Sequence, residues 1–109
     1  IEIYHKDIRI LEDLNLGSNI YSLDLLNNQI ELLDENCFKS LESLVFIRLA
    51  SNKLNKIYLN TFSVLKNLIE LDLGKNRIQF ILNGLFQNLN RLEKLYLNQN
   101  YLKSIKYLS

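Results

Sequence analysis

One feature of this sequence restricts its fold more than any other: residue types recur every 24 positions along the chain. The columns that keep this interval are Asn28, Asn52, Asn76 and Asn100; Leu25, Leu49, Leu73 and Leu97; Phe38, Phe62 and Phe86; and Leu41, Leu65 and Leu89. Chance does not hold several columns in register in this way, and such periods mark repeat architectures. The sequence therefore predicts a chain made of stacked copies of one unit.

Each unit contains a short alternation of apolar and polar residues. Leu71 and Leu73 flank Asp72, for example, and an alternation of period two is typical of a half-buried strand. A single unit cannot bury its apolar face alone, so neighbouring units stack and share a core. The pairs predicted to point into that core are Leu23 and Leu25, Ile47 and Leu49, Leu71 and Leu73, and Leu95 and Leu97.

The asparagine and phenylalanine columns are predicted to be structural. Each asparagine stands where the chain turns away from the strand, and an unmade hydrogen bond in a buried turn costs about 1–3 kcal/mol. Because a carboxamide carries both donors and an acceptor, the asparagines are expected to form a ladder that bonds the turns above and below. The phenylalanines are expected to fill the wider side of the core as a spine of rings.

The unit L-x-x-L-x-L-x-x-N-x-L-x-x-L-x-x-x-x-F-x-x-L-x-x closely resembles the leucine-rich repeat. With its phenylalanine column it is similar to the "typical" 24-residue subfamily of animal extracellular and cell-surface proteins, such as Toll-like receptors, matrix proteins and secreted insect immune proteins. The resemblance covers residues 20–105. It implies a repeat solenoid of the α/β class, a right-handed superhelix with a parallel β-sheet on its concave face and short irregular or 3-10 segments on its convex face.

A length of 109 residues, 48% of them hydrophobic, allows one domain and not two. We expect a single array with an irregular first turn at 1–19, full repeats at 20–43, 44–67 and 68–91, and a partial repeat at 92–109. In the first turn the register slips by about two residues. Terminal repeats need a polar outer face. Neither end of this sequence supplies one, so the chain is expected to be a segment of a longer array.

The sequence offers little for catalysis. With only three glycines it contains no phosphate-binding or dinucleotide-binding loop, and the H-E-x-x-H and G-x-S-x-G motifs are absent. Asp24 and Asp72 share a column at an expected separation of about 10 Å, but Arg48 stands between them. A charge ladder on an exposed sheet is far commoner than a catalytic carboxylate pair at such a distance. We therefore predict no enzyme, no catalytic residue and no cofactor.

The single cysteine and the single histidine exclude an internal disulfide, a multi-thiolate metal site and a His-rich ligand set. Cys37 shares its column with Thr61 and Leu85, so it is expected to be a small core residue, with a reactive or intermolecular thiol as the alternative. His5 is expected to be an ordinary surface histidine. No apolar run approaches the ~18 residues of a membrane span.

Side chains that alternate with the buried leucines should face solvent on the concave sheet. The predicted partner-binding residues of this face are Asp24, Phe46, Arg48, Glu70, Asp72, Lys94 and Tyr96. Opposite charges on neighbouring strands, such as Asp24 and Arg48, are explained equally by a ladder that keeps the sheet soluble. Phe46 favours a binding role, because an exposed aromatic residue beside an arginine is typical of interface hot spots.

Charge is divided unevenly along the chain. Residues 1–36 carry a net charge of −6 (8 acidic and 2 basic groups), and residues 37–109 carry +7 (11 basic and 4 acidic groups), which gives the total of +1. In a solenoid, sequence order is spatial order, so one end should be acidic and the other basic. This polarity is expected to orient a partner or to favour head-to-tail self-association, whereas the total charge offers no global attraction to nucleic acid.

These observations favour a non-enzymatic protein–protein recognition module of an extracellular or cell-surface protein, such as a receptor or an innate-immune protein, that binds through its concave sheet. One alternative is a structural spacer within a longer array. Turns at about 4.8 Å expose about a dozen concave side chains, fewer than the roughly 20–30 that a standard interface uses on each side. The other alternative is an intracellular, cytoplasmic scaffold.

Overall fold

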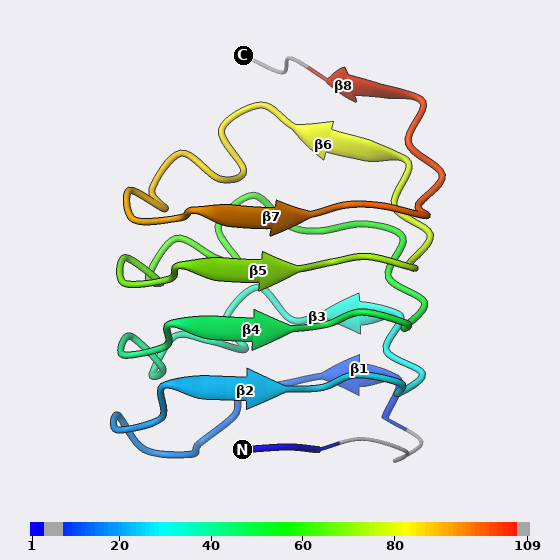
Figure 1. The fold of residues 1–109 in the computed structure, drawn as a ribbon. Coiled ribbons are helices and arrows are strands. Elements are labelled where there is room, and N and C mark those ends of the chain that lie inside the picture. The colour runs from blue at the N-terminus through cyan, green and yellow to red at the C-terminus, as the bar shows by residue number, and fades with distance from the viewer. Residues whose placement is uncertain (4–7, 107–109) are drawn as a thin grey trace.

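The repeating units fold as successive coils in the computed structural model, which describes residues 1–3 and 8–106 (Figure 1). The named strands are all short: β1 (Ile10–Leu11), β2 (Ser22–Asp24), β3 (Leu32–Leu33), β4 (Phe46–Arg48), β5 (Glu70–Asp72), β6 (Phe80–Leu82), β7 (Lys94–Tyr96) and β8 (Ser104–Lys106). Within the described residues no helix forms. Each coil lies on the one before it, so sequence order is stacking order.

One side of the stack is a continuous parallel sheet in the order β2-β4-β5-β7. Its register advances by one repeat at every strand, so Asp24 pairs with Arg48, Arg48 with Asp72 and Asp72 with Tyr96. In β2, β4 and β5 the central residue is buried and its neighbours face outward. The parallel sheet predicted for the concave face is confirmed.

The opposite, convex side contains strands as well as turns. There β1 pairs with β3 and β6 pairs with β8, in two separate parallel two-stranded sheets whose strands point opposite to those of the concave sheet (Figure 1). The backbone at Asp34 donates to the carbonyl of Leu11 at 2.9 Å, which extends the first pairing. The convex segments are thus more regular than the irregular or 3-10 structure expected from the sequence, because stacking places extended backbones of successive coils side by side.

The first turn is shorter than the others. Glu2 forms a bridge with Asp24, and Ile10 pairs with Leu32, so both sides of this turn are offset by 22 residues from the next one. The later strands of the concave sheet are offset by 24 residues. The first coil therefore joins the same stack with two residues fewer.

The core is a single column of leucine, isoleucine and phenylalanine side chains between the two sides. Leu23, Ile47 and Leu71 are buried, as predicted. The prediction for the last pair is confirmed for Leu97, which is half-buried and packs against the core, and is wrong for Leu95, which is 37% exposed. A solenoid residue is fully covered only when coils lie on both sides of it, and β7 is the last strand of its sheet among the described residues.

The asparagines form the predicted ladder with a different bonding pattern. The Asn52 amide donates to the carbonyls of Leu49, in its own turn, and of Leu25, in the preceding turn, both at 3.0 Å. Its Oδ1 accepts from the Ile30 backbone at 3.1 Å, again in the preceding turn. Asn76 repeats this arrangement. These bonds occupy both amide hydrogens and the oxygen, so the link to the following turn comes from the next asparagine.

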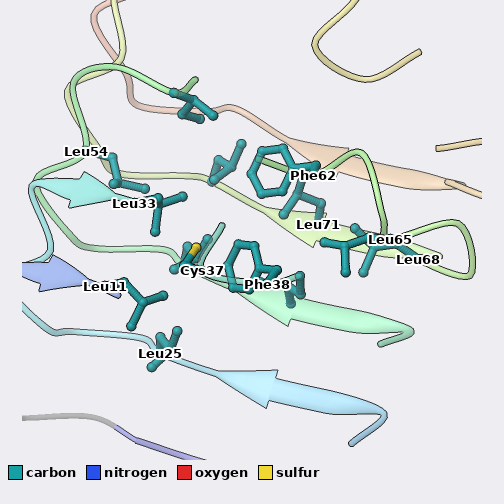
Figure 2. Packing of buried hydrophobic residues seen from close by; sticks show 14 of the residues in the cluster. Leu11, Leu25, Leu33, Cys37, Phe38, Leu54, Phe62, Leu65, Leu68 and Leu71 are labelled. Carbon is teal, nitrogen blue, oxygen red and sulfur yellow. The ribbon is translucent and has the colours of Figure 1, made fainter. Parts of the chain in front are cut away.

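The phenylalanine spine runs through the convex half of the core. The ring centroids of Phe38 and Phe62 lie 6.0 Å apart with planes 16° from parallel, and those of Phe62 and Phe86 lie 6.2 Å apart at 23°. Figure 2 shows Phe38 and Phe62 one above the other among buried leucines, with Cys37 beside Phe38. The spacing lies within the range of favourable aromatic pairs, as predicted.

Candidate functional site

The exposed face of the β2-β4-β5-β7 sheet brings together the side chains predicted to bind a partner. Here we call this face, from β2 to β7, the concave surface. The strands place them in two rows: Phe46, Glu70 and Lys94 lie in one, and Asp24, Arg48, Asp72 and Tyr96 lie in the other. The structure therefore assembles on one face residues that are up to 72 positions apart in the chain.

Two ion pairs link neighbouring strands of the concave surface. Arg48 Nη1 lies 3.5 Å from Asp24 Oδ2, and Lys94 Nζ lies 4.0 Å from Glu70 Oε1. The cations are largely exposed, so each pair contributes at most about 1 kcal/mol to stability. These charges are consequently free to exchange partners when a binding protein approaches.

The two aspartates of this face have a second role that the sequence analysis missed. Asp24 Oδ1 accepts a hydrogen bond from the Leu26 backbone at 3.0 Å, and Asp72 Oδ1 accepts one from the Gly74 backbone at 3.0 Å. Each bond spans two residues, the local pattern in which aspartate favours turns. An aspartate four residues before the column asparagine is the sequence signal for this role.

Two aromatic side chains of this surface are exposed to solvent. Phe46 is 44% exposed and Tyr96 is 42% exposed, on strands separated by β5 alone. Arg48 shares strand β4 with Phe46 and lies in the same row as Tyr96, with Asp72 of β5 between Arg48 and Tyr96. Two strand spacings and an offset of two residues along the strand put the aromatics about 12 Å apart, within the span of one partner loop.

Two hollows lie on either side of Arg48. The first, of about 340 Å³, is bordered by Glu2, Asp24, Phe46 and Glu70. The second, of about 270 Å³, is bordered by Lys75, Tyr96 and Asn98 and includes Ala50 and Gly74. Ala50 and Gly74 are both buried and fill little space, which leaves the second hollow open.

Gly74 leaves room for the side chains of its neighbours. A Cβ atom there would lie 2.8 Å from Asn98 Oδ1 and 3.2 Å from Asp72 Oδ1. A side chain at residue 74 would therefore push Asn98 aside and disturb the aspartate that bonds the turn. The small residues that shape this hollow were not singled out from the sequence.

A left-handed backbone conformation recurs directly before each asparagine. The non-glycine residues with positive φ in the described part of the chain are Asn27 (58°), Ser51 (58°), Lys75 (54°) and Gln99 (57°). This conformation is unfavourable for residues other than glycine and asparagine. It turns the chain out of the strand, and it places Ser51 and Lys75 at the border of the second hollow.

Cys37 is a core residue, as predicted. Its side chain is completely buried, and this burial, reinforced by the nearby Asp34 carboxylate, raises the pKa of the thiol to about 12. Since the thiolate is the reactive form, burial and the raised pKa both disfavour a reaction of Cys37 in the folded chain. The histidine predicted to lie on the surface, His5, is outside the described residues.

The described residues contain no cluster of three or more His, Cys, Asp or Glu side chains that could hold a metal ion. The same part of the chain has no helix long and apolar enough to cross a membrane. The site is thus an exposed sheet surface of mixed charge and aromatic character, suited to reversible binding.

Known proteins are similar to this chain in sequence and in structure. The family profile described as "Leucine rich repeat" matches residues 47–102. An internalin (inlF) from Listeria monocytogenes str. 4b F2365 aligns with a TM-score of 0.63 at 30% identity, over 76% of this chain and 23% of its own. The TLR13 chain of a TLR13–ssRNA13 complex aligns with a TM-score of 0.87 at 33% identity, over 94% of this chain and 14% of its own. The comparison with curated proteins finds no match.

Proposed function

Because the chain belongs to the leucine-rich repeat family, we propose that it is a non-enzymatic recognition module that binds a protein partner through its concave surface. The observation that carries this proposal is the exposure of Phe46 and Tyr96 on a continuous sheet that also presents Arg48, on the same strand as Phe46 and in the same row as Tyr96. Aromatic residues and arginine supply most of the binding energy at protein interfaces. The two hollows beside Arg48 give partner side chains a place to insert.

The charge pattern of the surface supports a protein ligand over a nucleic acid. Along the middle row, Asp24, Arg48 and Asp72 alternate in sign from strand to strand. Phosphate backbones require a run of positive charge, which this alternation interrupts. The RNA in the TLR13–ssRNA13 complex belongs to that protein, and we propose no nucleic-acid ligand here.

We place the module in an extracellular or cell-surface protein, with cytoplasmic scaffolds as the alternative setting. The 24-residue unit, which is similar to the "typical" subfamily, supports this placement, and the likeness to TLR13 supports a receptor or innate-immune role. The chain spans less than a quarter of the length of either structural neighbour. We further propose the repeat boundaries 1–19, 20–43, 44–67, 68–91 and 92–109, and a partner oriented by the acidic first third and basic remainder of the array.

A spacer within a longer array is the second candidate function. It is favoured by size: the molecule measures 35 × 30 × 22 Å, and its concave sheet has four strands within the residues that the structure describes. A standard interface uses about 800 Å² and roughly 20–30 residues on each partner. As a spacer, these repeats would hold neighbouring repeats at a fixed distance and contribute few contacts themselves.

The two functions are separated by a capture experiment with the 109-residue chain immobilised. We compare the parent with the triple variant Phe46→Ala/Arg48→Ala/Tyr96→Ala, using a secreted-protein extract and mass spectrometry. The matched control removes two exposed tyrosines and one exposed lysine outside the concave rows, as Tyr21→Ala/Lys66→Ala/Tyr101→Ala.

Recognition through the concave surface predicts proteins that the parent and the control retain and the triple variant loses. Circular dichroism must show the three chains equally folded. If all three retain the same proteins, or if none is retained, the concave surface is not the binding site and the spacer function is favoured.

A further inference from the structure

The convex side contains a cavity that the recognition surface does not use. Its volume is about 230 Å³, and it lies between segment 55–59 and β6, with walls from Lys56, Ile57, Tyr58, Leu59, Phe80 and Leu82. In the described chain, segment 55–59 belongs to no strand, whereas the coils before and after it form the β1–β3 and β6–β8 pairs. The cavity therefore lies where the convex hydrogen-bonded ladder is interrupted.

Ile57 belongs to the buried core and Leu82 packs against it, but the fold does not require an apolar residue at every wall of this cavity. Leu59 is 46% exposed, and the equivalent positions one repeat before and after it hold Glu35 and Asn83. Leu82 likewise stands in the column of Asp34. The array thus tolerates polar residues at these places, and an exposed apolar cluster that packing does not demand marks a binding site.

Among the side chains that the structure describes, Lys56 supplies the charge at the cavity. Lys56 Nζ lies 5.1 Å from the centre of the Tyr58 ring, in the geometry of a cation–π contact. Among the described side chains that border the cavity, none is negatively charged. An occupant that combines an apolar group with one negative charge would therefore bury the first against the leucines and place the second beside Lys56.

We propose that this cavity binds a small anionic amphiphile, with its apolar group between segment 55–59 and β6 and its carboxylate or similar head at Lys56. The size agrees with this class: an apolar cavity of about 150 Å³ holds one benzene ring, and this one is larger. Ligand pockets combine apolar walls with few polar groups that fix orientation. This site is separate from the concave surface and does not depend on the function proposed for it.

The test uses three ligands that share one apolar chain and differ in head-group charge: octanoate, 1-octanol and octylammonium. The two ionic ligands are titrated below their micelle concentrations, and 1-octanol below its solubility limit, into the ¹⁵N-labelled 109-residue chain and followed by NMR. The expected shifts map to residues 55–59 and 80–82. Octanoate should bind about two- to fivefold more tightly than octanol, the range of an exposed ion pair, and octylammonium most weakly.

Two variants separate the contributions of charge and of apolar contact. Lys56→Gln should bring octanoate to the affinity of octanol, whereas Lys66→Gln, an exposed lysine outside the cavity, should leave the affinity unchanged. Leu59→Asn introduces the residue found at the equivalent position 83 and should weaken both ligands about tenfold. Thermal unfolding of each variant checks that the array remains intact.

Three results would overturn the proposal. Equal affinity for the three ligands would show that the charge of Lys56 does not contribute to binding. Shifts centred on the concave surface would place the ligand elsewhere. Absence of saturable binding by octanoate would show that the cavity does not accept this class of ligand at all.

Discussion

The concave and convex sides of this solenoid share one sequence period but differ in backbone pairing. On the concave side, β2, β4, β5 and β7 form an unbroken ladder. On the convex side the ladder is interrupted at segment 55–59. The phenylalanine spine nevertheless passes through the same coil, with almost equal distances of 6.0 and 6.2 Å between successive ring centroids. Buried side chains therefore hold the stack in register on both sides, and backbone pairing is complete on one side only.

This difference shows where a repeat protein can vary. A concave strand is fixed by its inward leucine and by the asparagine turn that follows. A convex segment is anchored by its own buried residue (Leu33, Ile57 or Ile81) and by the phenylalanine of its coil. Its outer residues are free to differ between repeats, as Glu35, Leu59 and Asn83 do. The first side offers a regular surface for recognition, and the second side offers an irregular one.

The largest difference in stability between the two sides is expected from a substitution in the phenylalanine spine. Phe62→Ala should destabilise the chain by about 3–5 kcal/mol, because it removes a fully buried ring that contacts the rings on either side of it. Phe86→Ala should have a smaller effect, since Phe86 is only partly buried. Urea unfolding followed by circular dichroism measures both. Equal losses of stability for the two variants would contradict the view that the convex side, where its backbone pairing is interrupted, depends most on the Phe62 ring.

On the concave side the corresponding change is Asn76→Ala. It leaves the Leu54 amide and the carbonyls of Leu49 and Leu73 without their side-chain partner, which should cost about 2–3 kcal/mol. Asn100→Ala breaks the same kinds of bond in a partly buried turn and should cost less. Chemical denaturation at equal protein concentration gives the two values. A larger loss of stability for Asn100→Ala would contradict the expectation that the asparagine bonds stabilise the chain more where they are more deeply buried.

Burial of Cys37 on the convex side predicts a dependence of stability on pH. The thiol pKa is raised from 9.0 to about 12 in the folded chain by burial and by Asp34. Above pH 9 only the unfolded chain releases this proton, so folding should weaken by up to about 1.4 kcal/mol per pH unit until pH 12.

The measurement is the unfolding free energy of the parent and of Cys37→Ala between pH 8 and about pH 11. The variant controls for lysine and tyrosine titration and should lack this part of the slope. Identical slopes for the two proteins would show that the thiol is not shielded from solvent.

A stabilising change is expected at Thr61, two residues after the convex segment. Its Oγ1 is buried and has no hydrogen-bond partner among the described residues. Thr61→Val keeps the shape and removes the unsatisfied hydroxyl, which should raise stability by about 1 kcal/mol. The exposed Ser63→Val is a control that should not stabilise, because it removes the bond from Ser63 Oγ to the Asn60 carbonyl. Differential scanning calorimetry of the two variants distinguishes these outcomes.

The smallest effect concerns the left-handed residue of the concave turn. Lys75 has φ of 54°, and Asn27 takes the same conformation in an earlier repeat. Because asparagine tolerates this region better, Lys75→Asn should stabilise the chain by about 0.5 kcal/mol. Lys66→Asn, outside the column of positive φ, should give no gain. The melting temperatures of both variants decide whether the turn conformation is strained.

The sequence predicts the fixed columns of this fold well and the features between them poorly. The parallel sheet, the asparagine ladder, the phenylalanine spine and the burial of Cys37 follow from residues that recur every 24 positions. The exposure of Leu95 depends on which coils cover it, and the direction of the asparagine bonds depends on how closely the turns stack. Neither the exposure of Leu95 nor the direction of the asparagine bonds can be derived from the sequence of a single repeat.

The same division applies to the candidate sites. Alternation along a strand placed Phe46, Arg48 and Tyr96 on one face, because the pleat allows no other arrangement once the leucines are buried. The hollow at Gly74 and the convex cavity at Leu59 arise from differences between neighbouring repeats. Such differences appear in the sequence only as departures from the common unit.

The measurement that tests the recognition role most directly is photo-crosslinking from each side of the molecule. A benzophenone amino acid replaces Phe46 on the concave surface in one protein and Leu59 on the convex side in another, and both are irradiated in the same secreted-protein extract. Recognition through the concave surface predicts discrete protein adducts from position 46 and none of the same mass from position 59. Adducts from position 59 alone, or the same adducts from both positions, would contradict it.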